Sequence, residues 1–305
     1  SELYVKAFKG FNQIVDRTEF AIDLESRGSS GTLIMFETSK DNYQSVKLFS
    51  QTNHHIFSNS IANMVYQSMP NGTDFSNVKD LYQGLNYANL GGGYNYHTQN
   101  DHPSYLGTSY LTQQANMLYH TLHEMKDMDL SVFNQSSGEA IFFTYLGGTV
   151  IYSETVALIL GIVTLLLLIV LIFVSIWKKA FDFKKGLKSF ALLFVLLLLS
   201  AVLGYLLYYV LNHIAALLGV IDVSTVGTIS YSSSFLIVMM MLIVLLSLIF
   251  VGNRLFKRFN LSGQDLQKVY TYFVSFLTVV LSFVLKEASF LFLWMALPLL
   301  VIQLL

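Results

Sequence analysis

An uncharged run of 22 residues, Val156–Trp177, constrains this chain more than any other feature of its sequence. It reads VALILGIVTLLLLIVLIFVSIW. As an α-helix rising about 1.5 Å per residue it would be about 33 Å long, which is enough to cross a hydrocarbon core about 30 Å thick. We therefore predict a transmembrane helix here, which excludes a simple soluble globule.

Further apolar runs follow this segment as far as the end of the chain. Only 12% of all residues are charged and 54% are hydrophobic, whereas soluble domains carry about 25% charged residues. We predict a polytopic α-helical membrane domain over 156–305 with about five transmembrane helices, at 156–177, 189–211, 235–251, 269–285 and 290–305. Lys286 and Glu287 interrupt the last two runs, and we expect them to form a turn outside the bilayer, because charges within it are costly.

Basic residues in the loops predict the orientation of these helices. Five lysines lie between 178 and 188, and four further basic residues lie between 254 and 268. The stretch 212–234 contains no lysine or arginine. Because cationic loops are retained in the cytoplasm, both basic loops are predicted to be cytoplasmic and residues 1–155 to lie outside it.

Composition limits the chemistry of this outer region. Residues 1–155 carry 15 acidic against 8 basic side chains, so no basic face is available for nucleic acid. The chain has no cysteine, which excludes disulfides, thiolate zinc sites and cysteine nucleophiles. Any metal must therefore be held by His, Asp or Glu. The start shows no signal peptide and the end shows no polar tail, so we expect the chain to be part of a longer protein.

The outer region has the alternating pattern of an α/β domain. We assign 1–137 to this domain and 138–155 to a juxtamembrane hairpin and linker. The expected strands are 20–24, 32–38 and 85–90, and the expected helices are 42–51, 59–68 with Ser58 as its N-cap, and 108–127. A hairpin around Gly147 and Gly148 is expected over 141–152.

Two segments of this region could carry chemistry. In the first, Asp23–Gly28, a strand would deliver Glu25 to its carboxyl end, where α/β sheets bind ligands, although an exposed Glu25 beside Arg27 is more often a weak ion pair. In the second, Gly91–Gly93 precede His97. Taken alone, His97 suits metal binding, acid–base chemistry or simple hydrogen bonding to neighbouring loop residues.

The remaining histidines give weaker signals. The adjacent pair His54 and His55 is expected in a surface turn, because neighbouring side chains point apart. His120 and His123 are expected on a solvated helix face. Neither a G-x-S-x-G elbow nor a P-loop is present.

Four ordered segments carry a resemblance. They read FAIDLESRGSSG (20–31), LIMFET (33–38), MPNGTDF (69–75) and GLNYANLGGGYNYHTQND (84–101). In this order they resemble the membrane-bound aminopeptidase-Y-like zinc peptidases of the vacuolar membrane protease and endoplasmic reticulum metallopeptidase types. The resemblance covers about residues 15–130 and continues into the multi-span tail.

This resemblance implies a catalytic α/β sandwich on the non-cytoplasmic side, with two zinc ions bridged by a carboxylate and a water. It places Glu25 and His97 as metal ligands, with Asp74 and Asp101 supporting the site. Tyr94 or Tyr96 would contact the substrate or a developing oxyanion. In such sites zinc polarises the scissile carbonyl and activates a water, while a carboxylate takes the proton.

One departure from the family pattern is large. The family's earlier His, bridging Asp and adjacent Glu pair have no match in residues 1–19. Glu25 and His97 supply one ligand for each zinc, whereas catalytic zinc usually takes three from protein. We therefore expect the missing N-terminal half of the same protein to complete the site, and the fragment alone to be inactive.

Taken together, the sequence predicts the C-terminal part of a membrane-anchored zinc-dependent exopeptidase, aminopeptidase-like, that acts on peptides. Its partners would be peptide substrates and the lipid bilayer. The lack of cysteine favours a bacterial cell surface over a vacuole or the lumen of the endoplasmic reticulum. The alternative is a non-catalytic multi-span membrane protein whose outer domain is only peptidase-like, because fold does not determine function.

Overall fold

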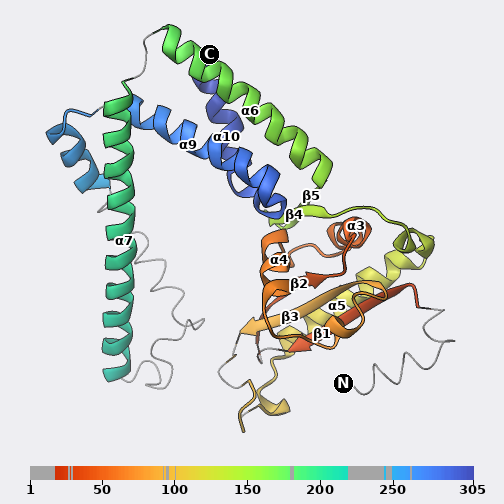
Figure 1. Ribbon diagram of the computed structural model, residues 1–305. Coiled ribbons are helices and arrows are strands. Elements are labelled where there is room, and N and C mark those ends of the chain that lie inside the picture. Colours follow the sequence, from red (N-terminus) through yellow and green to blue (C-terminus); the bar gives the residue numbers. More distant parts are fainter. Residues whose placement is uncertain are drawn as a thin grey trace. The chain divides into compact units, whose positions relative to one another are not determined.

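The computed structural model describes most of the chain. The described residues are 18–26, 28, 30–91, 93, 96–99, 101–178, 182–218, 244, 249–261 and 263–305. The chain forms two compact units (Figure 1). The first unit comprises residues 1–162 and 279–291, and the second comprises 163–278 and 292–305.

A three-stranded mixed sheet forms the centre of the first unit. It contains β1 (Phe20–Ser26), β2 (Ser30–Thr38) and β3 (Gln83–Gly91). The order is β1-β3-β2, with β3 parallel to β1 and antiparallel to β2. The three predicted strands are therefore present. β1 and β2 are consecutive in the sequence but are not neighbours in the sheet, because β3 lies between them.

One face of this sheet carries the hydrophobic core. Side chains alternate between the faces of a strand, so Leu33 and Met35 of β2 lie on the same face as Leu85 and Tyr87 of β3. They are buried together with residues of α3 (Tyr43–Thr52) and α5 (Thr108–Met125), among them Val46, Phe49, Tyr110 and Met117. The apolar stripe of α5 does not predict this buried face, because Leu111 and Leu122 are 47% and 57% exposed, whereas Tyr110, Met117 and Thr121 are buried.

Helix α4 (Ser60–Ser68) packs against β2, where Phe36 and Tyr66 meet edge to face with ring centroids 4.6 Å apart. The expected N-cap, Ser58, is wrong. Asn59 caps the helix by accepting a hydrogen bond from the Ala62 amide at 2.8 Å. Ser58 is instead buried and donates to the Met35 carbonyl at 2.7 Å, because the chain passes beside β2 at that point.

A two-stranded hairpin leads from the α/β region to the apolar helices. It consists of β4 (Ala140–Tyr145) and β5 (Gly148–Ser153). Ala140 and Phe142 reach the hydrophobic core of the sheet. β5 ends at Ser153 and α6 begins at Glu154, so no linker separates them.

Three of the described helices are long and apolar enough to cross a membrane, namely α6 (Glu154–Trp177), α7 (Phe183–Leu217, with the apolar span at Lys184–Leu211) and α9 (Gly263–Val284). α10 (Phe290–Leu304) is apolar but shorter. The predicted span at 235–251 lies almost entirely outside the described residues. The α/β content is thus present, whereas the complete sandwich and the five crossings remain predictions.

Lys286–Ala288 form a short 3-10 turn, η7, between α9 and α10. This turn belongs to the first unit and packs against the α/β region. The Lys286 ammonium pairs with the Glu154 carboxylate, and Ser60 donates a hydrogen bond to the Glu287 carbonyl at 2.7 Å. The charged residues at 286 and 287 therefore form a turn, as expected.

Within the second unit, Leu168 and Leu171 of α6 bury their side chains with Leu300 of α10. The Tyr272 hydroxyl of α9 donates a hydrogen bond to the Ser175 hydroxyl of α6 at 2.7 Å. These contacts connect three apolar helices through one small core.

Candidate metal centre

Two carboxylates project from β1 on the sheet face opposite the hydrophobic core. Asp23 and Glu25 are two residues apart, so they share this face. Asn86 of β3 is the register partner of Asp23 and also of Glu37 in β2. One face of the sheet is therefore apolar, and the other gathers carboxylates and an amide.

The segment Thr73–Phe75 covers these carboxylates. The Phe75 amide donates a hydrogen bond to Asp23 Oδ2 at 2.9 Å, and the Asp74 amide donates to Glu25 Oε1 at 3.4 Å. The Phe75 ring is buried, which anchors the segment. The main chain of the T-D-F motif thus holds Glu25, while the Asp74 side chain is exposed.

Glu37 fixes the same segment from the neighbouring strand. Its side chain is 0% exposed, and its carboxylate accepts from Lys79 Nζ at 2.7 Å and from Asn86 Nδ2 at 3.0 Å. Asn86 also donates to the Thr73 hydroxyl at 2.8 Å. A buried ion pair and an amide therefore connect β2, β3 and the loop that contacts Glu25.

Burial shapes the electrostatics of this face. It raises the pKa of the Asp23 carboxyl by removing solvent from the charged form, and the neighbouring charges of Asp74 and Glu37 act in the same direction. The hydrogen bond from the Phe75 amide opposes this rise. A cation placed beside Asp23 and Glu25 would relieve this electrostatic cost.

The glycines of the two motifs meet at the ends of the strands. A Cβ atom built on Gly28 would lie 2.1 Å from the Gly91 carbonyl oxygen, so no other residue fits there without a shift. The Tyr110 hydroxyl of α5 donates to the Glu25 carbonyl at 3.0 Å from the other side. Gly28 and Gly91, which are 63 positions apart in the sequence, thus meet at one corner of the sheet.

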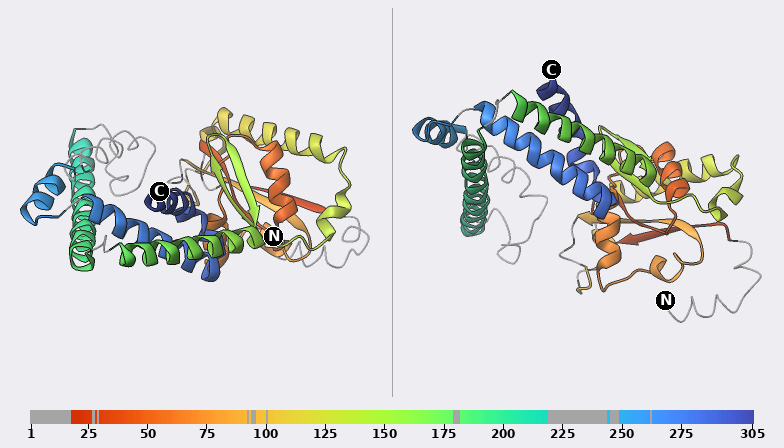
Figure 2. Two further views of the ribbon diagram at one scale, coloured as in Figure 1. Left: turned by 90° about the horizontal axis from the view of Figure 1, so that it is seen from above. Right: turned by 45° about the horizontal axis from the view of Figure 1, so that its top comes forward.

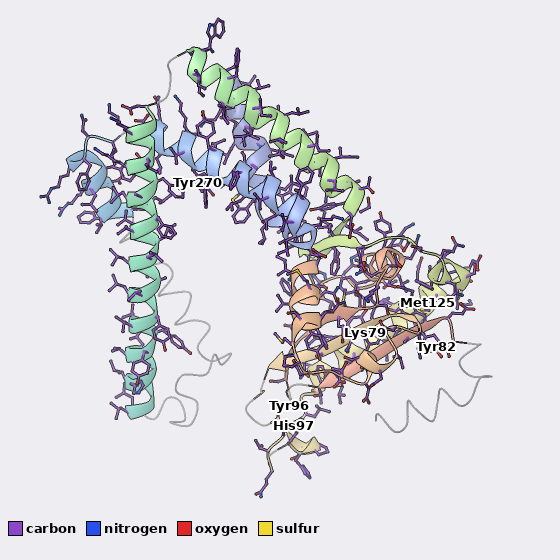
Figure 3. All side chains as sticks on the ribbon, viewed as in Figure 1. Lys79, Tyr82, Tyr96, His97, Met125 and Tyr270 are labelled. Atoms are coloured by element: carbon purple, nitrogen blue, oxygen red, sulfur yellow. The ribbon has the colours of Figure 1, made fainter. Side chains whose placement is uncertain are left out.

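His97 lies in the segment beyond the end of β3, where Figure 3 shows it beside Tyr96. The two rings are stacked with centroids 3.8 Å apart. The His97 amide donates to Asp101 Oδ2 at 3.3 Å, and its backbone φ is +58°. Asp101 therefore stabilises the loop conformation that presents His97. Tyr94 lies outside the described residues.

The described residues do not complete a metal site. Among them, no group of three His, Asp or Glu side chains is arranged to hold an ion. Glu25 and His97 have donor atoms that zinc accepts, but one carboxylate and one imidazole are fewer than the three protein ligands a catalytic zinc usually takes.

Four of the other six histidines are brought together, which their sequence spacing did not predict. His54, His55, His120 and His123 line a single cavity of about 450 Å³ with Glu124 at the ends of α3 and α5. His54 and His55 form the expected surface turn, and His120 and His123 are exposed on α5. The cavity arises because α3 packs along α5.

Sequence reasoning missed three residues of the sheet face. Asp23 could have been found from its spacing of two from Glu25. Glu37 could have been found as the one charged residue of β2. No sequence pattern marks Lys79, because only the folding of the chain brings its side chain to Glu37.

Comparisons with known proteins identify a peptidase family and individual proteins that this chain resembles. Residues 1–122 match the family model of Peptidase family M28. The chain is 28% identical over 132 residues to endoplasmic reticulum metallopeptidase 1 of Homo sapiens, covering 41% of this chain and 15% of that protein. It is 29% identical over 136 residues to the Rattus norvegicus protein of the same name, covering 43% and 15%. No solved structure matches.

These matches show what the chain is similar to. It is a membrane-associated protein whose first part is like an M28 zinc peptidase, which confirms the resemblance predicted from the sequence. The region that resembles endoplasmic reticulum metallopeptidase 1 covers only 15% of that protein's length. The activity in that protein's name is therefore only a proposal for this chain.

Proposed function

We propose that this chain is part of a membrane-anchored, zinc-dependent exopeptidase that removes residues from the N-terminus of peptides on the non-cytoplasmic side, at a bacterial cell surface. The observation that supports it best is the hydrogen bond from the Asp74 amide to Glu25 at the carboxyl end of β1. It connects two of the family's motifs and lies within the residues that match the peptidase family.

In this proposal Glu25 and His97 are ligands of two different zinc ions. Asp101 positions the His97 loop, and the Asp74 main chain orients Glu25. Tyr96, whose ring stacks on that of His97, would contact the substrate. The remaining ligands and the general base would come from the N-terminal part of the full-length protein.

The non-catalytic alternative has one observation in its favour, which is the absence of a three-ligand group among the described residues. Hydrolysis assays with the full-length protein separate the two functions. We expect it to cleave aminoacyl chromogenic substrates and to lose this activity on chelation, with recovery when zinc is returned. N-acetylated versions of the same substrates should be poor substrates. Chelator-insensitive cleavage, or none, would contradict the proposal.

The orientation predicts which positions an impermeant thiol reagent can reach. Because the chain has no cysteine, single cysteines at Ser136 and Lys184 report separately on the α/β region and on the first basic loop. In intact cells we expect labelling at 136, and labelling at 184 only after permeabilisation. Labelling at 184 but not at 136 in intact cells would show that the orientation is the opposite of the predicted one.

A further inference from the structure

The turn of the β4–β5 hairpin has an unusual residue. Tyr145 and Gly148 are register partners, so Leu146 and Gly147 form a two-residue loop. Their φ angles are +48° and +84°, the pattern of a type I′ turn. Asn-Gly is the preferred sequence there, because asparagine adopts positive φ at lower cost than leucine. The leucine is thus unfavourable for the turn itself.

The leucine also gains little from packing. Leu146 is 88% exposed, and the neighbouring Tyr145 is 63% exposed. The unfavourable backbone conformation of Leu146 is therefore not compensated by burial of its side chain within the protein. Transfer of this side chain into a non-aqueous environment would offset that cost.

The two faces of the hairpin indicate where that environment lies. Ala140 and Phe142 of β4 point into the core of the sheet. Phe143 and Tyr145 point to the opposite face, because side chains alternate along a strand. On that face the Phe143 ring stacks on Phe290 with centroids 4.8 Å apart, and the Tyr152 hydroxyl lies 3.4 Å from that of Ser289.

Tyr145 therefore lies on the face of the hairpin that contacts the start of α10. The end of the hairpin away from Tyr145 is followed by Glu154, where α6 begins and where Lys286 forms its ion pair. In the left view of Figure 2 the hairpin extends from the start of α6. Two helices with the length and apolarity of membrane spans, α6 and α9, thus have their ends next to this face.

We propose that the tip of the β4–β5 hairpin is a lipid-contacting element, with Tyr145 and Leu146 in the headgroup and upper acyl region of the leaflet that α6 enters. A bilayer fits better than a protein partner because β5 passes into α6 without a linker, only six residues and about 20 Å from the tip. Tyrosine is also enriched at membrane interfaces. The contact would hold the α/β region against the membrane, whatever its catalytic activity.

Site-directed spin labelling tests this proposal. The cysteine-free chain would carry one nitroxide at Leu146→Cys, or at Tyr145→Cys should the first variant not fold, in phosphatidylcholine vesicles. The reference positions are exposed Asp80 of the α/β region and exposed Leu166 of α6. We expect a severalfold lower collision rate with a water-soluble nickel chelate than at 80, and a higher rate with oxygen, approaching that at 166.

Two outcomes would overturn the proposal. Accessibilities at 146 equal to those at 80 would place the tip in water. Low accessibility to both nickel and oxygen would indicate a protein contact instead.

Leu146→Asn distinguishes lipid contact from a purely structural role. Asparagine suits the turn, so the Tm in detergent should stay the same or rise. In vesicles a label at 145 should become more accessible to nickel. A lower Tm with unchanged accessibility at 145 would show that Leu146 serves the fold alone.

Discussion

Replacing His97 by alanine should lower the peptidase activity of the full-length protein at least about 100-fold while leaving its fold intact. Loss of residues that merely orient metal ligands costs about 10- to 100-fold, so loss of a ligand itself should cost no less. His97 lies in a loop beyond β3 and outside the hydrophobic core, so its removal leaves the sheet unchanged. Initial rates and circular dichroism of the variant measure the two effects.

Two matched variants accompany this test. Glu25→Gln should lose activity to a similar extent, because the amide keeps the acceptor for the Asp74 amide but removes the charge that attracts a cation. His120→Ala should keep near-normal activity, since His120 lines the separate cavity between α3 and α5. Full activity in both His97→Ala and Glu25→Gln would disprove the site.

Replacing Lys79 by methionine should destabilise the α/β region by about 3 kcal/mol or more. The Glu37 carboxylate is 0% exposed and would lose the one cation it contacts in the described structure, while Lys79 itself is 24% exposed. Removing one partner of a buried ion pair leaves an uncompensated charge, which typically costs about 3–5 kcal/mol. Chemical denaturation in detergent measures the free energy of unfolding.

The double variant Glu37→Gln with Lys79→Met provides the control. Glutamine can still accept the hydrogen bond from Asn86, and no charge remains buried, so the double variant should be more stable than Lys79→Met alone. If the two variants are equally destabilised, the ion pair does not hold the Thr73–Phe75 loop as described. Activity should follow the stability of that loop, because its main chain contacts Glu25.

The regular elements could be predicted because each follows local rules. The β-branched and aromatic residues of β2 and the uncharged length of α6 depend on neighbouring residues only. The helix at α5 was predicted in the same way, but its buried face was not, because that face depends on how α5 packs against the sheet. Strand order could not be predicted this way. β3 pairs with both β1 and β2 although about 45 residues separate it from β2. This pairing depends on contacts between residues that are distant in the sequence.

The motifs that resemble zinc peptidases single out Glu25 and His97, whose role as metal ligands stays a prediction. Side chains that only the packing of distant segments brings together could not be predicted from the sequence. The Glu37–Lys79 pair depends on the irregular register between Met35 and Glu37, which sets the face on which Glu37 lies. The four-histidine cavity depends on α3 packing along α5, so the separate pairs at 54–55 and 120–123 gave no sign of it.

The zinc content of the purified full-length protein tests the central claim most directly. Elemental analysis should find two zinc ions per chain in the parent protein and in His120→Ala, and fewer in His97→Ala and Glu25→Gln. Two zinc ions together with full aminopeptidase activity in His97→Ala would contradict the assignment of His97 as a ligand and favour the non-catalytic alternative for this region.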